Sequence, residues 1–299
     1  MNLIFNSNIK LLFLKSKWVL YNIFSPKIYV KINKKRILAP RFHKLQLFLD
    51  INPCYDRFLT FLVKHLKEYD FIDVGANIGD TATHIYTSSN PPINSILIEP
   101  NFKFRKYLNL NLKNISSNCD TKINVIDLPV SSLENIPELD TRASTSTQRN
   151  TDKKINAISL DKILDGFNYD YDRNRLLIKI DIDGYDWDAI LSAKEIIKIK
   201  KPLLFFECVI LNTFQLNGYL SLLEIITNNY KNILILDNFG VPYFDGKLNV
   251  DILKNSFLKC FLASKRKKTE FFYFDILLYN NADKKIVNKA ISDVLNIIN

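Results

Sequence analysis

Short apolar runs alternate with segments of helical apolar spacing from residue 71 to the C-terminal part of the chain. This alternation is typical of βαβ units, in which helices connect parallel strands and cover both faces of the sheet. The polar stretch 140–152 has no apolar period and is predicted to be a loop. Seven runs are predicted to be strands, at 71–74, 95–98, 123–126, 176–180, 203–206, 233–236 and 271–278. The sequence therefore predicts an α/β fold with a mostly parallel sheet and helices on both faces.

The composition is that of a globular chain, with 299 residues, of which 47% are hydrophobic and 24% are charged. It has no apolar run of the roughly 18 residues that a membrane-spanning helix needs, and lysines interrupt its N-terminal apolar stretches. We therefore expect a cytoplasmic protein. The four cysteines and three histidines are scattered without ligand spacing, so we expect neither a metal site nor a disulfide framework.

The positive charge is confined to the N-terminal sixth of the chain. Of the 41 basic side chains, ten lie in residues 1–49, where there is no acidic one, which leaves 31 basic against 31 acidic in residues 50–299. A nucleic-acid enzyme with a basic groove across its main domain is therefore disfavoured. We predict a basic N-terminal appendage at 1–49, made of an amphipathic helix and a short strand, followed by the main domain at 50–299.

Two interpretations of this appendage stay open. Lysines lie between apolar residues at helical spacing over residues 3–24, which is typical of a helix that binds a membrane surface. In that case residues 1–26 would make peripheral membrane contact, with Leu12, Phe13 and Trp18 toward the lipid chains. The other interpretation is a helix that packs on the domain or on a second subunit in a homo-oligomer.

The strongest local pattern is at residues 71–82, where an apolar strand leads into a turn with Gly75 and Gly79 and then into a helix. The whole chain has only seven glycines. A backbone that passes close under a ligand needs glycine, because a Cβ atom would collide with the ligand. The helix that follows would direct free N–H groups at the ligand. The pattern therefore predicts a cofactor-binding loop.

Three polar residues indicate which cofactor this loop takes. Asn77 occupies the position where a dinucleotide fold needs its middle glycine, which disfavours a nicotinamide cofactor. Asp73 at the strand end can pair with an ammonium group, and Glu99 at the end of the next strand can accept both ribose hydroxyls. These features suit S-adenosylmethionine. The predicted cofactor-binding residues are Asp73, Gly75, Ala76, Asn77, Gly79 and Glu99.

Charged residues also follow the fourth and fifth predicted strands, where the ligand of an open α/β sheet lies. If the acceptor of the methyl group is a hydroxyl, the transfer needs a base for the acceptor proton. We predict Asp181 or Asp183 as this base or as an acceptor-orienting group, with Glu207 second, and Lys179 and Tyr185 as substrate contacts. The alternation of apolar and charged residues over 178–183 is equally typical of an edge strand with a solvated charged face.

Six segments in order resemble the FkbM family of S-adenosylmethionine-dependent methyltransferases over about residues 43 to 280. These segments are residues 73–80, 98–101, 159–161, 178–186, 201–207 and 237–240. The resemblance implies a class I methyltransferase (Rossmann-like) sheet of seven strands with the last one antiparallel. It also implies O-methylation, often of sugars or polyketides. The acid at 183 is commonly Glu in the family and is Asp183 here.

The function expected from the sequence is S-adenosylmethionine-dependent O-methylation of a hydroxyl on a sugar or surface-glycan precursor. The acceptor would be a small molecule or glycan, and no nucleic-acid partner is expected. One alternative is a nicotinamide-dependent oxidoreductase on a Rossmann sheet. The other is a non-catalytic glycan-assembly scaffold that keeps the fold, against which the complete set of cofactor residues argues.

Overall fold

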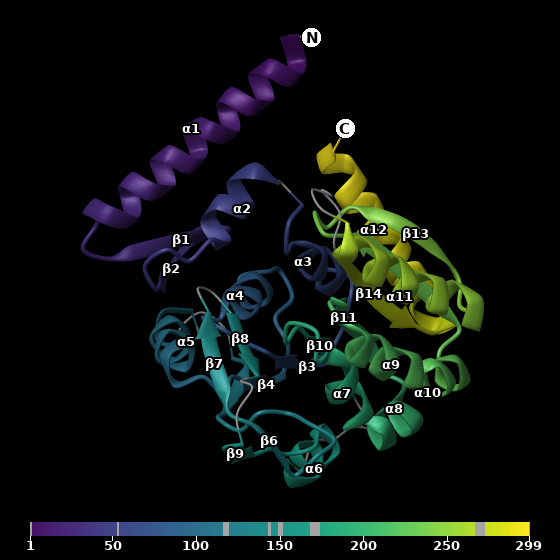
Figure 1. The fold of residues 1–299 in the computed structure, drawn as a ribbon. Helices are drawn as coiled ribbons and strands as arrows, with labels where there is room; N and C mark the ends of the chain where they lie inside the picture. The colour runs from purple at the N-terminus through teal and green to yellow at the C-terminus, as the bar shows by residue number, and fades with distance from the viewer. Residues whose placement is uncertain are drawn as a thin grey trace.

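The computed structural model describes residues 2–52, 54–115, 120–142, 145–148, 152–167, 174–266 and 273–298. Its centre is an eight-stranded sheet in the order β13-β12-β14-β11-β10-β3-β4-β5 (Figure 1). The strands are β3 (Tyr69–Val74), β4 (Asn94–Ile98), β5 (Lys122–Ile126), β10 (Arg175–Ile180), β11 (Leu203–Cys208), β12 (Asn232–Asp237), β13 (Pro242–Lys247) and β14 (Phe274–Tyr279).

All seven predicted strands belong to this sheet, within a few residues of the predicted ends. Strands β5, β4, β3, β10 and β11 pair in parallel, while β14 lies antiparallel between β11 and β12. Residues 271–272 of the last predicted strand lie outside the described residues. The sheet has one strand more than predicted, because β13 pairs antiparallel with β12 at the edge. Its sequence contains Pro242, Asp245 and Gly246, which are turn-forming residue types, so it has no apolar run to mark it.

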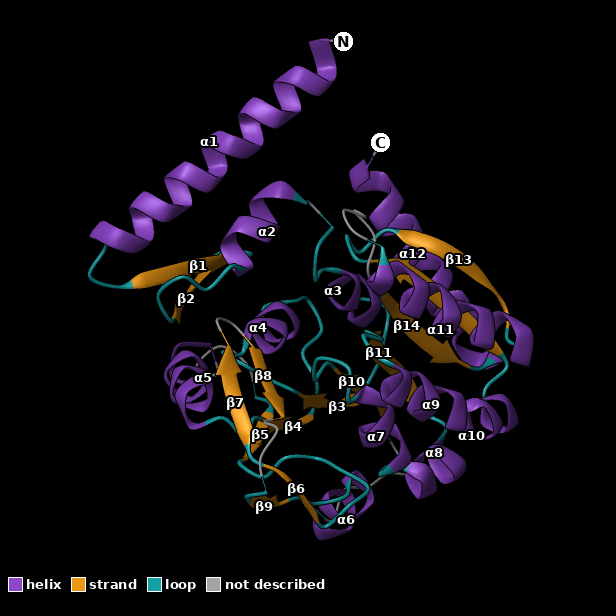
Figure 2. Cartoon of the chain, in the orientation of Figure 1, coloured by secondary structure: helices purple, strands orange, loops and turns teal. Residues whose placement is uncertain are grey.

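Helices cover both faces of the sheet (Figure 2). Side chains alternate between the two faces, so that Leu177 belongs to one core and its neighbour Ile178 to the other. The first core is covered by α3 (Phe58–Val63), α4 (Asp80–Tyr86), α5 (Phe102–Ile115) and α12 (Lys284–Ile298), the last following a short 3₁₀ turn, η2 (Asn281–Asp283). The second core is covered by α6 (Leu160–Gly166), α7 (Asp186–Leu191), α8 (Lys194–Lys200), α9 (Thr213–Ser221), α10 (Leu223–Asn229) and α11 (Val250–Lys265).

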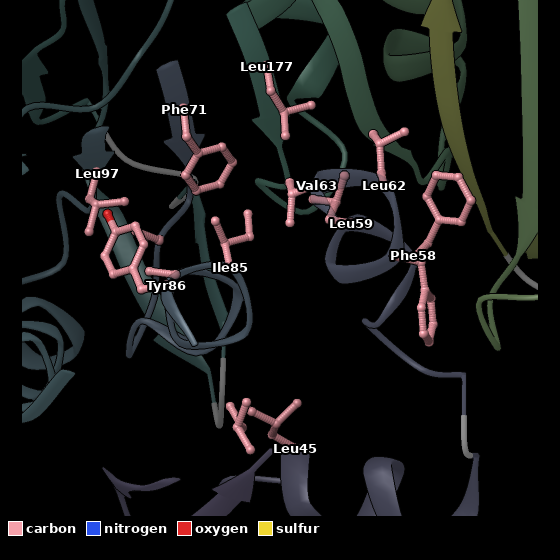
Figure 3. Close-up of a cluster of buried hydrophobic side chains, with 14 of the residues drawn as sticks. Leu45, Phe58, Leu59, Leu62, Val63, Phe71, Ile85, Tyr86, Leu97 and Leu177 are labelled. Carbon is pink, nitrogen blue, oxygen red and sulfur yellow. The ribbon is translucent and has the colours of Figure 1, made fainter. Parts of the chain in front are cut away.

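Figure 3 shows part of the first core, where helix α3 packs over the central strands. Leu62 and Val63 of α3 are fully buried, as are Phe71 of β3 and Leu177 of β10. Every residue of α3 is buried, which explains why its sequence is apolar at every position except Thr60 rather than amphipathic. The central strands are therefore covered on this face, and their carboxyl ends are held in a fixed place.

The N-terminal segment contains α1 (Asn2–Phe24), the antiparallel pair β1 (Ile28–Ile32) and β2 (Lys35–Ala39), and α2 (Leu45–Ile51). Val30 and Ile37 of the hairpin are buried in the first core. The side chain of Asn111 on α5 bonds both backbone groups of Leu38, at 2.7 and 2.9 Å. The hairpin thus shares a core with the sheet, and α1 is the part that lies outside it (Figure 1). None of the described helices is both long and apolar enough to cross a membrane.

The segment predicted as a loop at 140–152 contains strand structure instead. β7 (Leu139–Arg142) and β8 (Thr145–Gln148) form an antiparallel hairpin, next to the pair β6 (Asn135–Pro137) and β9 (Lys154–Asn156). The prediction of a loop was wrong for residues 140–142 and 145–148, because it relied on an apolar period, while residues 143–144 and 149–151 lie outside the described residues. A hairpin can be held by its backbone hydrogen bonds without one.

Candidate active site

The turn between β3 and α4 lies at the carboxyl end of the sheet and needs glycine at two positions. Gly75 has a φ of 87° and Gly79 a φ of 83°, and both values are in the left-handed region. A Cβ atom on Gly75 would lie only 2.0 Å from the carbonyl oxygen of Asp181. Glycine is therefore required at 75 so that this turn can pass the end of β10, which is a different reason from the predicted contact with a ligand.

The backbone N–H groups of this turn are mostly used within the protein. The amides of Gly75 and Ala76 both donate to the carbonyl of Ile98, each at 3.0 Å. The amide of Asn77 donates to the Glu99 carboxylate at 2.9 Å. The amides of these three residues are therefore not available to a ligand, and the free N–H groups expected from the sequence are those of the helix that follows. Their bonds instead fix the turn against the end of β4.

Glu99 is held in place on both of its carboxylate oxygens. One oxygen accepts from the amide of Asn77 and the other from the amide of Asn101, at 2.9 and 2.8 Å. The residue is only 4% exposed, and this burial raises its pKa to about 7 although the two amides act in the opposite direction. Each oxygen keeps a further lone pair, so the carboxylate can still accept two hydroxyl groups.

Glu99 lines a largely apolar cavity, which we call the apolar cavity. Its other lining residues include Ile98, Pro100, Phe104, Val130, Ile136, Leu139 and Tyr185. Leu139 begins the β7–β8 hairpin, so this hairpin borders the apolar cavity. Apolar side chains together with a carboxylate that can accept hydroxyl groups have the chemistry needed for an adenine ring and its ribose.

A second cavity is lined by residues of the same turn, and we call it the acidic cavity. Gly75, Asn77, Asp181 and Asp183 line both cavities, so a single extended ligand could occupy them together. Six carboxylates line the acidic cavity, from Asp56, Asp80, Asp181, Asp183, Glu207 and Asp275. Tyr55, Tyr273, His43 and Lys179 are also in its lining.

The Lys179 ammonium is held between two carboxylates at the end of β10. It lies 3.1 Å from the Asp73 carboxylate and 3.2 Å from that of Asp181. Burial would lower the pKa of Lys179, but the carboxylates of Asp181, Asp73 and Asp80 outweigh it and raise that pKa well above its ordinary value. Burial raises the pKa of Asp73 to about 6. Near neutral pH this arrangement is therefore an ion pair buried beneath the cofactor turn.

The acids that face the acidic cavity differ in the pKa that their surroundings impose. Burial and the nearby Asp181 raise the pKa of Asp183 to about 7. Burial and the charge of Asp181 raise the pKa of Glu207 well above its usual range. Glu207 also lies opposite Asp275 in the β11–β14 register, and the pKa of that acid is raised well above its usual range by burial and by Asp56. Burial and nearby acids raise the pKa of Asp56, another acid of this cavity, to about 8. Asp183 is the acid that combines a pKa near neutral pH, as general-base catalysis requires, with a place in the lining of both cavities.

The structure brings the predicted site residues together at the carboxyl end of the sheet. Three of them, Asp73, Lys179 and Tyr185, have surroundings that differ from their predicted roles. Asp73 is fully buried and lines neither cavity, because its carboxylate faces Lys179. Lys179 lines the acidic cavity, but its ammonium is already paired. Tyr185, predicted as a substrate contact, lines the apolar cavity, as Glu99 does, and not the acidic cavity. Asp181, Asp183, Glu207, Gly75 and Asn77 line the acidic cavity as a group.

Other residues of the site were not found by sequence reasoning. Asp275 interrupts an otherwise apolar strand, and that interruption was the available signal. Asp186 is fully buried and accepts from the amides of Ile182 and Gly184, at 3.3 and 3.1 Å, which shapes the turn that carries Asp183. Among the residues that the structure describes, no group of three or more His, Cys, Asp or Glu side chains is arranged to hold a metal.

The strand order places this chain in the class I methyltransferase fold. In this fold the last strand is inserted antiparallel between two parallel strands, and the cofactor turn follows a central strand. The model of the methyltransferase FkbM domain matches residues 73–231, more than half of the chain. The chain therefore belongs to the FkbM methyltransferase family. This match confirms the expected family and a methyltransferase domain within the chain.

Solved structures with similar folds are more distant. A methyltransferase FkbM from Methylobacillus flagellatus is 22% identical, with 47% of this chain and 33% of that chain covered and a TM-score of 0.34. An O-methyltransferase from Bacillus cereus in complex with SAH is 13% identical, with 81% and 92% covered and a TM-score of 0.44. This chain thus spans about a third of the length of the Methylobacillus protein. No curated protein matches it.

Proposed function

We propose that this protein transfers the methyl group of S-adenosylmethionine to a hydroxyl of an uncharged sugar or surface-glycan precursor. The observation that carries the proposal is the acidic cavity, which adjoins the cofactor turn and contains Asp183. The turn residues fit the cofactor, because Glu99 keeps lone pairs for the ribose and the apolar cavity beside it suits adenine. When bound, the cofactor supplies an electrophilic methyl on a sulfonium.

In this proposal the residues of the chain orient the acceptor and take its proton. Asp181 and Asp183 line both cavities, so an acceptor hydroxyl in the acidic cavity would meet the methyl group beside them. Asp183 accepts the hydroxyl proton as the new C–O bond forms and the C–S bond breaks, which leaves a methyl ether and S-adenosylhomocysteine. Lys179 acts as a positioning residue, because its ammonium holds Asp181 at 3.2 Å.

The lining of the acidic cavity supports an uncharged acceptor. Its lining has six carboxyl groups against two ammonium groups, those of Lys44 and Lys179, and the latter is occupied by Asp73 and Asp181. A phosphate or carboxylate group in this cavity would lie among acids that outnumber the cations, and it would compete with Asp73 and Asp181 for the Lys179 ammonium. A sugar ring instead offers hydroxyl groups, which can donate to carboxylates and accept from protonated acids. This complementarity is why we propose a sugar hydroxyl.

The first experiment measures cofactor binding. Calorimetry of the full chain with S-adenosylmethionine, S-adenosylhomocysteine and NAD should show binding of the first two. Binding of NAD alone would favour the oxidoreductase alternative, and binding of none would favour the scaffold alternative. The Glu99→Gln variant, which removes the charge at the proposed ribose site, tests whether this side chain contributes to the binding of S-adenosylmethionine.

The second experiment measures transfer of a labelled methyl group to a panel of glycosides. Each neutral hexoside is paired with the matching uronic acid, so that the two differ by one carboxylate. We expect labelling of neutral members and at least about tenfold weaker labelling of the acids, which corresponds to about 1.4 kcal/mol. Equal or better labelling of the uronic acids would contradict an uncharged acceptor while leaving the methyltransferase itself in place.

A further inference from the structure

The helix α1 is attached to the rest of the molecule along one face only. Asn22 on that face is fully buried and its side chain accepts from the amide of Phe42. The Trp18 indole donates to the carbonyl of His43 at 3.2 Å. The Arg41 guanidinium donates to the carbonyls of Asn22, Ile23 and Ser25 at the end of the helix. These bonds to residues 41–43 hold the C-terminal half of α1 in one orientation.

The opposite face of α1 carries large apolar side chains in contact with solvent. Leu12, Val19, Leu20 and Ile23 follow the i, i+7, i+8, i+11 spacing of one helical face, and Phe13 and Phe24 lie at its border. Their exposed fractions are high, at 67% for Leu12, 65% for Phe13, 54% for Leu20 and 78% for Phe24. We call these six residues the outer stripe. Because α1 docks through its other side, the outer stripe is left without a partner within the described chain.

Basic residues border the outer stripe. Lys15 and Lys17 are exposed on the two sides of it. The hairpin that follows adds further exposed basic side chains, from Lys27, Lys31, Lys34 and Arg36. No acidic side chain occurs among residues 1–49. The face therefore combines an apolar stripe with cations only.

We propose that the outer stripe of α1 binds the surface of an anionic lipid bilayer, with α1 lying in the plane of the interface. The apolar side chains would enter the boundary between headgroups and acyl chains, while Lys15 and Lys17 contact lipid phosphates. A second copy of this chain is a poorer occupant. Pairing two outer stripes would bring the lysines of both copies together without any acid on α1 to compensate them.

The proposal differs from the sequence-based hypothesis in the residues that it assigns. Trp18 was expected to point toward the lipid, but its indole is bonded to His43 on the docked side. His43 also lines the acidic cavity. Residues 41–43 therefore connect α1 with the acidic cavity. If α1 binds lipid, this connecting segment lies close to the bilayer. The proposal does not depend on the methyltransferase activity.

The test is co-sedimentation of the full chain with vesicles. One set contains phosphatidylcholine alone, and the other contains phosphatidylcholine mixed with phosphatidylglycerol. The wild-type chain should sediment with the anionic vesicles and less with the neutral ones. L12E/L20E should reduce the anionic partition coefficient by at least about tenfold, and K15Q/K17Q by about fivefold for each lysine.

The matched control is L262E/L295E, which places the same charges on exposed leucines of α11 and α12. Circular dichroism should show the same helix content and melting midpoint for all variants, and the control should bind vesicles like the wild type. Equal recovery of wild type and L12E/L20E in the supernatant overturns the proposal. So does a wild-type dimer, seen by sedimentation velocity, that L12E/L20E converts to a monomer without any vesicle binding.

Discussion

The Lys179 ammonium lies 3.1 Å from the Asp73 carboxylate, across two neighbouring parallel strands whose register places the two residues side by side. Both side chains are almost completely removed from solvent, at 7% and 0% exposure. A buried charge needs its partner, because its solvation is lost. The pair lies directly beneath the turn that is expected to hold the cofactor, so its charge balance bears on both stability and binding.

Replacing Lys179 by Met should therefore destabilise the protein strongly. The change leaves the Asp73 carboxylate buried without its cation, and we expect a loss of about 3–5 kcal/mol in the free energy of unfolding. The measurement is urea denaturation followed by circular dichroism. The matched control is Lys162→Met, whose ion pair with Glu134 is exposed on both sides and should change stability by less than about 1 kcal/mol. Equal effects of the two substitutions would contradict the buried pair.

Gly75→Ala should disrupt the cofactor turn. The new Cβ atom would lie 2.0 Å from the Asp181 carbonyl oxygen, and the φ of 87° is strained for alanine. We expect a loss of at least about 1–3 kcal/mol in unfolding free energy, together with weaker S-adenosylmethionine binding by calorimetry. Gly166→Ala is the control, because nothing lies within 4 Å of its Cβ position. A Gly75→Ala variant with unchanged stability and affinity would show that the turn tolerates a side chain.

The affinity for S-adenosylmethionine should depend on pH through Glu99. Its pKa is about 7, and the ionised form accepts ribose hydroxyls better than the protonated form. Affinity should therefore rise with pH up to about 7 and then level off, with a slope of up to about tenfold per pH unit below that value. Glu99→Gln should bind more weakly and lose this dependence. Calorimetry at several pH values would check it, and a parallel slope in the variant would assign the titration to another group.

The stability of the cofactor-free protein should show the opposite trend for the same residue. The pKa of Glu99 in the folded state is about 7, above the ordinary value of 4.5. Because the pKa is raised on folding, the protein takes up a proton on folding at pH values between 4.5 and 7. The contribution of Glu99 to the free energy of unfolding is therefore fully present below about pH 4.5 and is lost as the pH rises to about 7. Wild type should lose about 3 kcal/mol over this range relative to Glu99→Gln. Urea titrations of both proteins at the two pH values would check this. An equal change in the unfolding free energy of wild type and Glu99→Gln would contradict the raised pKa of Glu99.

Turnover should separate the roles of the acids in the acidic cavity. Asp183→Asn removes the proposed base and should lower kcat by about 10²–10⁴-fold. Burial and neighbouring acids raise the pKa of Glu207 well above its usual range, which favours its protonated form, so Glu207→Gln should change kcat far less. The wild-type rate should rise with pH through about 7, the pKa of Asp183. Full turnover in both Asp183→Asn and Asp181→Asn, with unchanged cofactor binding, would refute the assignment of the base.

The sequence by itself determined the class of fold and the location of the site. The apolar runs fixed seven of the strands in the sheet, because strands buried on both faces have to be apolar along their length. The turn with Gly75 and Gly79 and the acids that follow β10 marked the carboxyl edge of the sheet, and the structure places them together there. These features are local in sequence, so a local pattern reveals them.

The tertiary structure alone decided which charges meet. Asp73 pairs with Lys179 because β3 and β10 are neighbours, although 106 residues separate the two in the sequence. Glu207 meets Asp275 because β14 is inserted antiparallel next to β11. The sequence also did not show which face of α1 packs on the domain and which face stays exposed, because the helical spacing of its apolar residues is compatible with both. Each of these outcomes depends on long-range packing, and only the folded chain sets the burial that moves the pKa values of its acids.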